Sequence, residues 1–162
     1  AAVILPRGLV IPGLNDSKKL TEKRREQLYD VITQKALHWA AAFASVEEIE
    51  ALNILGATYL AMNRAIAGLG VEPELALIDG NRAKGVEHSC KCVVGGDGKC
   101  ADIAAASIIA KVTRDRLMYE LDGKYPGYGF AKHKGYGTKL HYELLRTYGP
   151  SPVHRKTFLK NL

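Results

Sequence analysis

One short segment constrains this chain more than any other: an apolar run at residues 75–78 that ends abruptly on Asp79 and a following Gly-Asn turn. This pattern is typical of a buried strand, and strands of α/β sheets present functional groups at their carboxyl ends. A second apolar run, residues 92–94, breaks at two glycines and presents Asp97. Two strand ends that each carry a carboxylate indicate a site for a hard divalent cation, Mg²⁺ or Mn²⁺, although either Asp alone is more commonly an ordinary turn residue.

The chain is long enough to form a hydrophobic core of its own. With 162 residues, 47% hydrophobic and 25% charged, it has the composition of one globular domain, and we predict a single domain over residues 1–162. The formal charge of +6 suits a polyanionic partner, although many proteins without such a partner match it. The distribution of charge is more informative, because basic residues cluster near both ends: Lys18, Lys19, Lys23, Arg24, Arg25, Lys132, Lys134, Lys139, Arg155, Lys156 and Lys160.

Cysteine usage and hydropathy indicate the cellular compartment. The chain's 3 cysteines, Cys90, Cys92 and Cys100, are an odd set without paired metal-ligand spacing, which argues against a disulfide framework and a structural zinc site. We find no secretory signal in the sequence and no apolar run of membrane-spanning length. The sequence therefore predicts a cytoplasmic protein with no membrane partner.

The remaining pattern alternates between strand and helix signals, so we predict an α/β fold. Besides the two Asp-bearing runs, strands are expected at residues 1–5 and, as a short buried strand, at 39–43. Helices are expected up to residue 29 after capping side chains at 15–17, over 46–69 with a break near Asn53 and Gly56, over 103–119, and over 138–148.

Several segments together resemble bacterial type 2 ribonuclease H, the ribonuclease HII family. They are Asn-Asp-Ser-Lys-Lys-Leu at 15–20, Leu-Ile-Asp-Gly-Asn at 77–81, Gly-Asp at 96–97, the small-residue run at 103–115 and His-Lys-Gly-Tyr-Gly-Thr at 133–138. They occur in the family's order and span nearly the whole chain. The resemblance implies a ribonuclease H-like fold, a mixed sheet flanked by helices. It also implies an endonuclease that cuts RNA in RNA/DNA hybrids or at single ribonucleotides embedded in duplex DNA.

The resemblance also assigns roles to individual residues. Asp79 and Asp97 match the third and fourth of the family's acidic residues, so we expect both to be catalytic metal ligands that share a Mg²⁺ or Mn²⁺ ion. Paired divalent ions held by carboxylates can activate water and stabilise the leaving oxygen of a phosphodiester. Asp102 is interpreted instead as an ordinary acid at a helix N-terminus.

Substrate contacts are expected in the basic segments. Tyr136 matches the family's tyrosine that stacks against the sugar beside the cut, with Lys134 in the same loop. Lys18 and Lys19 are predicted to contact phosphates, although a solvated helix start explains them nearly as well. Three histidines, His133, His141 and His154, carry no ligand spacing and are expected to be loop or surface residues.

One element of the family pattern does not occur in the sequence. The family begins with a central strand that carries an Asp-Glu pair followed by Gly-Arg-Gly, a loop that reads the ribose 2′-hydroxyl. Residues 1–5 match the second strand, and no Asp-Glu pair followed by Gly-Arg-Gly is present. The simplest interpretation is a fragment of a longer parent, and the other is a sheet that closes in an unusual way.

Three functions remain open on the sequence alone. The first is the metal-dependent ribonuclease, and the second is a catalytically impaired fragment that still binds nucleic acid. The third is nucleotide binding on the same fold class, as in actin-like ATPases. That function requires Gly-rich phosphate loops, which isolated glycines after the strands do not supply.

Overall fold

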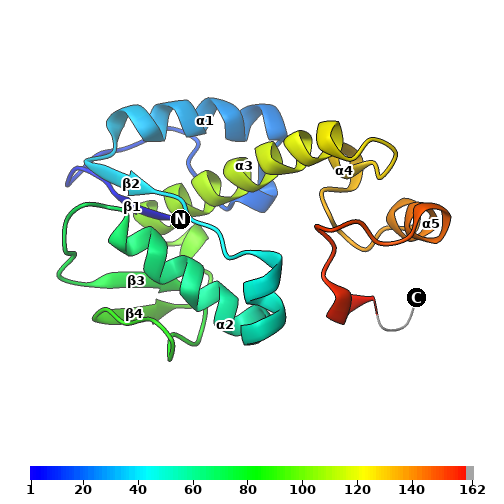
Figure 1. Cartoon of the computed structure of the whole chain (residues 1–162). Coiled ribbons are helices and arrows are strands. Elements are labelled where there is room, and N and C mark those ends of the chain that lie inside the picture. Colours follow the sequence, from blue (N-terminus) through cyan, green and yellow to red (C-terminus); the bar gives the residue numbers. More distant parts are fainter. Residues whose placement is uncertain (160–162) are drawn as a thin grey trace.

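The computed structural model describes residues 1–159 and shows strands and helices in alternation (Figure 1). The strands are β1 (Ala2–Ile4), β2 (His38–Ala40), β3 (Ala76–Asp79) and β4 (Cys90–Val93). The α-helices are α1 (Glu22–Lys35), α2 (Val46–Ala67), α3 (Ala101–Lys124), α4 (Phe130–His133) and α5 (Lys139–Tyr148). Short 3-10 turns are η1 (Ser17–Lys19), η2 (Gly96–Gly98) and η3 (Lys156–Phe158). No helix within residues 1–159 is both long enough and apolar enough to cross a membrane.

The strands form two separate pairs. β1 pairs antiparallel with β2, with Val3 opposite Trp39, and β3 pairs parallel with β4, with Asp79 opposite Val93. Both strand directions are therefore present, as expected for a mixed α/β fold.

Helix α3 packs against most of the other elements. It contacts α1, β1, β3, η2 and α4, and Figure 1 shows α4 and α5 beyond its C-terminal end, away from the strands. Its buried face includes Ala105, Ile108, Ile109 and Val112, which pack against the buried residues Val3, Leu5, Ile11, Leu28 and Ile32. The alanines at 104–106 let neighbouring backbones approach closely. Burial of this apolar surface is the main stabilising contribution to the fold.

Local capping explains where the first helices begin, and it corrects one prediction. The Asp16 side chain accepts a hydrogen bond from the Lys18 N–H and so caps η1, not a long helix. The helix proper, α1, begins at Glu22 after the N-cap Thr21 and continues to Lys35. The prediction of one helix from residues 15–17 to residue 29 was therefore wrong at both ends, because the longer helix begins at a second capping residue, Thr21.

Two further predictions can be compared directly with the structure. The break expected in the second helix is confirmed: Asn53 has φ of 59°, and its side chain accepts hydrogen bonds from the N–H groups of Leu55 and Gly56. The strand expected at 39–43 lies instead at His38–Ala40. It is not buried, because Trp39 is 37% exposed and packs edge-on against Tyr29 of α1.

Candidate active site and nucleic-acid contacts

Strand β3 carries Asp79 to its carboxyl end, as the apolar pattern predicted. Ile78 is buried, whereas Asp79 is exposed. The Gly96 N–H donates a hydrogen bond of 2.9 Å to Asp79 Oδ1. Because Gly96 directly precedes Asp97, this bond holds the two acidic segments against each other.

The turn after β4 places Asp97 in η2. Asp97 is 9% exposed, so its carboxylate is largely shielded from water. A Cβ atom at Gly96 would lie only 2.6 Å from Ile103 Cδ1, so any larger residue there would displace the Ile103 side chain of α3. Asp97 and Asn15 line a cavity of about 270 Å³.

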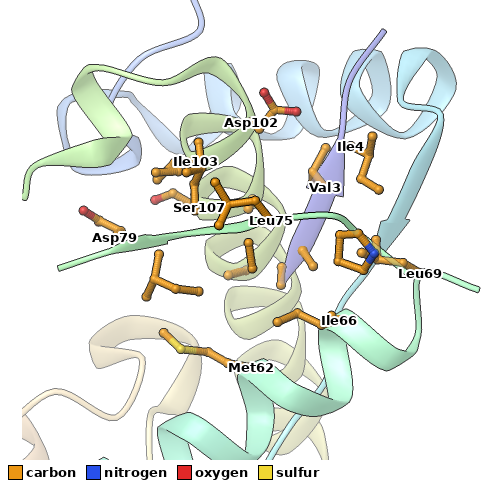
Figure 2. A pocket seen from close by; sticks show the side chains of 18 of the residues that line it. Val3, Ile4, Met62, Ile66, Leu69, Leu75, Asp79, Asp102, Ile103 and Ser107 are labelled. Carbon is orange, nitrogen blue, oxygen red and sulfur yellow. The ribbon is translucent and has the colours of Figure 1, made fainter. Parts of the chain in front are cut away.

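A larger groove lies between the two strand pairs. Its volume is about 700 Å³, and β1 and β3 line it from opposite sides, above residues of α2 and α3 (Figure 2). The lining is mostly apolar, and Leu75 and Leu77 are 49% and 40% exposed. Within residues 1–159, β1 and β3 do not pair with each other across this space. Two unpaired strand edges beside exposed apolar side chains are typical of an interaction site.

Two acidic residues border this groove. Figure 2 shows Asp79 at one end of β3 and Asp102 on α3, toward β1. Asp102 Oδ1 accepts a hydrogen bond of 2.8 Å from the Leu5 N–H, the residue that follows β1. The interpretation of Asp102 as an ordinary acid at a helix N-terminus was therefore incomplete, because its side chain also joins α3 to the residue after β1.

The carboxylates suit a metal in type but are few in number. Aspartate oxygens are the ligands that Mg²⁺ and Mn²⁺ prefer, so Asp79 and Asp97 fit such an ion chemically. Over the described range, 1–159, however, no three His, Cys, Asp or Glu side chains come close enough together to hold a metal ion. The shared ion expected at Asp79 and Asp97 stays a prediction.

The basic residues near the start of the chain lie close to α3. Lys18 and Lys19 are exposed in η1, and the preceding Ser17 hydrogen-bonds through Oγ to Ser107 Oγ at 2.8 Å. Ser107 also lines the groove. This contact anchors the exposed segment that carries both lysines beside the groove, and their contact with phosphates stays a prediction.

The loop that carries Tyr136 returns to the middle of α3. The Tyr136 ring is 62% exposed, with Lys111 Nζ 5.7 Å from its centroid. Lys111 lies about 14 Å along the helix axis from Asp102, by the rise of an α-helix. Lys134, by contrast, places its Nζ 3.1 Å from the Tyr119 ring centroid and 3.9 Å from Glu22 Oε1. Its ammonium is therefore engaged within the protein, and a phosphate contact by Lys134 stays a prediction.

The histidines near the end of the chain differ from the sequence prediction. His133, His141 and His154 are 5%, 8% and 8% exposed, so their interpretation as loop or surface residues was wrong with respect to burial. They pack with Phe130 and Tyr128 in one aromatic cluster. The aromatic residues near them in the sequence could have indicated this burial, because large aromatic side chains usually pack in the protein interior.

Comparison with known proteins agrees with this arrangement. An α/β fold with acidic strand ends and a long helix packed against the strands is consistent with the ribonuclease H-like class. The family model described as Ribonuclease HII matches residues 7–161. Ribonuclease HII of Dechloromonas aromatica (strain RCB) is 56% identical over 158 residues, which cover 98% of this chain and 81% of that protein. The chain therefore belongs to the ribonuclease HII family.

Solved structures agree with the fold. The crystal structure of the ribonuclease H2 from Pyrococcus horikoshii OT3 matches with a TM-score of 0.72 at 26% identity, covering 90% of this chain and 76% of that one. The structure of the PCNA:RNase HII complex from Archaeoglobus fulgidus matches with a TM-score of 0.69 at 23% identity, covering 93% and 79%. The second likeness concerns the fold alone. As a member of this family, the protein is a type 2 ribonuclease H. Enzymes of the family act on nucleic acid and generally depend on divalent metal ions.

Proposed function

We propose that the protein hydrolyses RNA in RNA/DNA hybrids and at single ribonucleotides embedded in duplex DNA, with Mg²⁺ or Mn²⁺ held by Asp79 and Asp97. The observation that carries this proposal is the hydrogen bond from the Gly96 N–H to Asp79 Oδ1, which joins the two acidic segments. Membership of the ribonuclease HII family supports the same reaction.

The carboxylates hold the reacting phosphodiester through the metal in this proposal. A divalent ion bound there supplies charge stabilisation and an activated water, the chemistry that phosphodiester hydrolysis needs. Gly96 orients Asp79 by occupying one of its oxygens, which leaves the other oxygen free for coordination. Tyr136 stacks on the sugar beside the cut, and Lys18 and Lys19 neutralise phosphates. Lys134 joins them once its ammonium turns away from Tyr119 and Glu22.

Two carboxylates are insufficient for a complete two-ion site. Two divalent ions bring four positive charges, and Asp79 and Asp97 return only two negative ones. In this proposal the remaining carboxylates and the reader of the 2′-hydroxyl come from a strand that carries Asp-Glu and Gly-Arg-Gly, as the family resemblance implies. The groove between β1 and β3 supports this placement, because an added strand there would pair with both free edges and cover Leu75 and Leu77.

A second function has its own support. We also propose, as the alternative, that the 162-residue chain binds nucleic acid and cuts it poorly: the basic segments and the exposed Tyr136 are present without a third metal ligand among the described residues. Binding without cutting distinguishes this alternative from the full reaction.

The experiment uses the chain extended at its N-terminus by a strand carrying Asp-Glu and Gly-Arg-Gly. Its substrate is duplex DNA that contains one ribonucleotide, with Mg²⁺ or Mn²⁺. We expect cleavage by this chain, and we expect Asp79→Asn or Asp97→Asn to reduce it by at least about 1,000-fold, since a lost metal ligand costs several kcal/mol of transition-state stabilisation.

The matched control is Asp30→Asn, which removes an exposed carboxylate on α1 and should leave the rate unchanged. Calorimetric titration with Mn²⁺ provides a second readout, in which both active-site variants should bind the ion more weakly. Normal cleavage by Asp79→Asn and Asp97→Asn would show that the metal site lies elsewhere.

A further inference from the structure

Three buried histidines occupy the region where the C-terminal elements meet. His133 ends α4, His141 lies in the first turn of α5, and His154 follows α5. The rings of His133 and His141 stack at 3.9 Å between centroids with an interplanar angle of 11°. Buried imidazoles need hydrogen-bond partners for both ring nitrogens, and each of these six nitrogens has one.

The partners of His141 and His154 fix the direction of every hydrogen bond between them. The Tyr136 carbonyl can only accept, so His141 Nδ1, 2.9 Å away, carries the proton. His141 Nε2 is then an acceptor, and His154 Nε2 donates to it at 3.0 Å. His154 Nδ1 in turn accepts from the Ser151 backbone N–H at 3.0 Å and from the Ser151 hydroxyl at 2.7 Å. The bonds run in one direction from Ser151 to the Tyr136 carbonyl, and both histidines are neutral.

His133 holds the other side of the same loop. Its Nε2 donates to the Tyr128 carbonyl at 2.7 Å, and its Nδ1 accepts from the Gly135 N–H at 3.0 Å. The loop needs such support because Lys134 and Gly135 both have left-handed backbone conformations, with φ of 51° and 78°. A non-glycine residue at positive φ is strained and persists where its surroundings hold it.

These contacts hold the Tyr136 backbone and leave its side chain free. The carbonyl accepts from both the Thr138 N–H and His141 Nδ1, whereas the ring is 62% exposed. A fixed backbone beneath an exposed ring is the arrangement that a stacking residue requires, because less freedom is lost when a ligand binds.

An added proton is incompatible with this chain of bonds. If His141 is protonated, its Nε2–H faces the Nε2–H of His154. If His154 shifts its proton to Nδ1, that N–H can donate to Ser151 Oγ, but the Ser151 backbone N–H then loses its acceptor. Burial lowers the pKa of both His141 and His154, and the nearby His133 lowers each further. The other titratable rings against the pair are Tyr128 and Tyr142.

Two arginines lie near the cluster, and Arg114 places its guanidinium against Gly135. Arg155 follows His154 in the chain and stacks on Phe158 at 3.8 Å. Among residues 1–159, no carboxylate hydrogen-bonds to His133, His141 or His154 that could stabilise an imidazolium.

We propose that Ser151, His154 and His141 form a relay of hydrogen bonds, closed only when both histidines are neutral, that positions Tyr136 for nucleic-acid binding. His141 and His154 are positioning residues in this account and touch no substrate. The inference rests on the proposed function, because it takes Tyr136 as the residue that stacks on the substrate.

The test measures affinity of the 162-residue chain for an RNA/DNA hybrid by fluorescence anisotropy, without divalent metal. We expect His141→Ala to weaken binding roughly fivefold at pH 7.5, about the value of one hydrogen bond. His141→Asn should recover part of the loss, because the Asn side-chain N–H can replace Nδ1 as donor to the Tyr136 carbonyl. Thr147→Ala, an exposed change on the same helix, is the control and should have no effect.

A double-mutant cycle separates positioning from general loosening of the region. In the Tyr136→Ala background, His141→Ala should weaken binding no further, because the relay acts only through Tyr136. Additive losses would overturn the relay while leaving the role of Tyr136 intact. If Tyr136→Ala alone has no effect on affinity, both the relay and the stacking role of Tyr136 are wrong.

Nuclear magnetic resonance tests the relay without any substrate. The ¹⁵N shifts should show the proton on Nδ1 of His141 and on Nε2 of His154 at pH 7.5. On acidification, the Tyr136 amide signal should move with the same apparent pKa as these two imidazoles. The opposite tautomers, or a Tyr136 signal that ignores their titration, would contradict the proposal even if a variant fails to fold.

Discussion

The C-terminal aromatic cluster and the acidic strand ends differ in how many of the partners that their polar groups need lie within residues 1–159. Around Tyr136, the histidine nitrogens and the loop carbonyl have hydrogen-bond partners within the chain. Around Asp79, two strands line an open groove, two leucines are half exposed, and no third metal ligand lies close among residues 1–159. Under the proposed function, binding and cutting then depend on separable parts of the molecule, so changes in one region should leave the other's readout intact.

After the metal-ligand changes, the largest effect should come from blocking the groove. Ala106 lines the groove on α3, and a tryptophan at this position would occupy the space proposed for an added strand. In the extended chain, Ala106→Trp should reduce cleavage by at least about 100-fold, because the added carboxylates can no longer reach Asp79. Cleavage assays measure this, with Ala67→Trp on the exposed side of α2 as control. Full activity of Ala106→Trp would argue against the groove as the position of that strand.

Removing the stacking ring should have the next largest effect. Here the loss should appear in binding, whereas blocking the groove should reduce cleavage. Tyr136→Ala should weaken binding to an RNA/DNA hybrid by about 1–3 kcal/mol, the contribution of one base–aromatic stack, or roughly 5- to 150-fold. Tyr136→Phe keeps the ring and should bind nearly normally. A loss of equal size in both variants would assign the effect to the hydroxyl and not to stacking.

The lysines of η1 should affect mainly the salt dependence. If Lys18 and Lys19 each neutralise one phosphate of a duplex, replacing both with Ala should reduce the log–log salt slope of binding by about 1.8. Anisotropy titrations between low and physiological salt measure the slope. An unchanged slope would mean that these residues are solvated and contact no phosphate.

The smallest effect concerns stability and pH. The pKa values of His141 and His154 are lowered in the folded protein, so the unfolded chain binds more protons below about pH 6.5. The stability that these residues contribute is therefore complete above that pH and decreases as the pH falls toward the lowered pKa values. Thermal melts at several pH values should show this decrease, and His154→Asn should make it smaller. A melting temperature that rises on acidification in this range would contradict the assignment of neutral histidines.

Much of this arrangement could be predicted from local sequence. The apolar run before Asp79, the break at Asn53 and the final helix that ends at Tyr148 depend on neighbouring residues, and the structure has all of them. The restart at Thr21 was missed because two capping residues compete within a few positions, and local pattern does not choose between them.

Features that depend on distant contacts could not be predicted in the same way. The bond from Asp102 to Leu5 and the contact between His141 and His154 join separate elements, which no periodicity reveals. The burial of the three histidines follows from these tertiary contacts as well. The separation of the sheet into two strand pairs also becomes visible only once the strands are placed in space.

One paired assay tests the central claim most directly. The 162-residue chain and the chain extended by the Asp-Glu and Gly-Arg-Gly strand are compared on duplex DNA containing one ribonucleotide, with binding and cleavage measured in the same samples with Mn²⁺. The account predicts that both chains bind, with affinities that weaken steeply with salt, and that only the extended chain cuts efficiently. Equal and robust cleavage by the 162-residue chain would contradict it, because Asp79 and Asp97 would then not depend on further carboxylates.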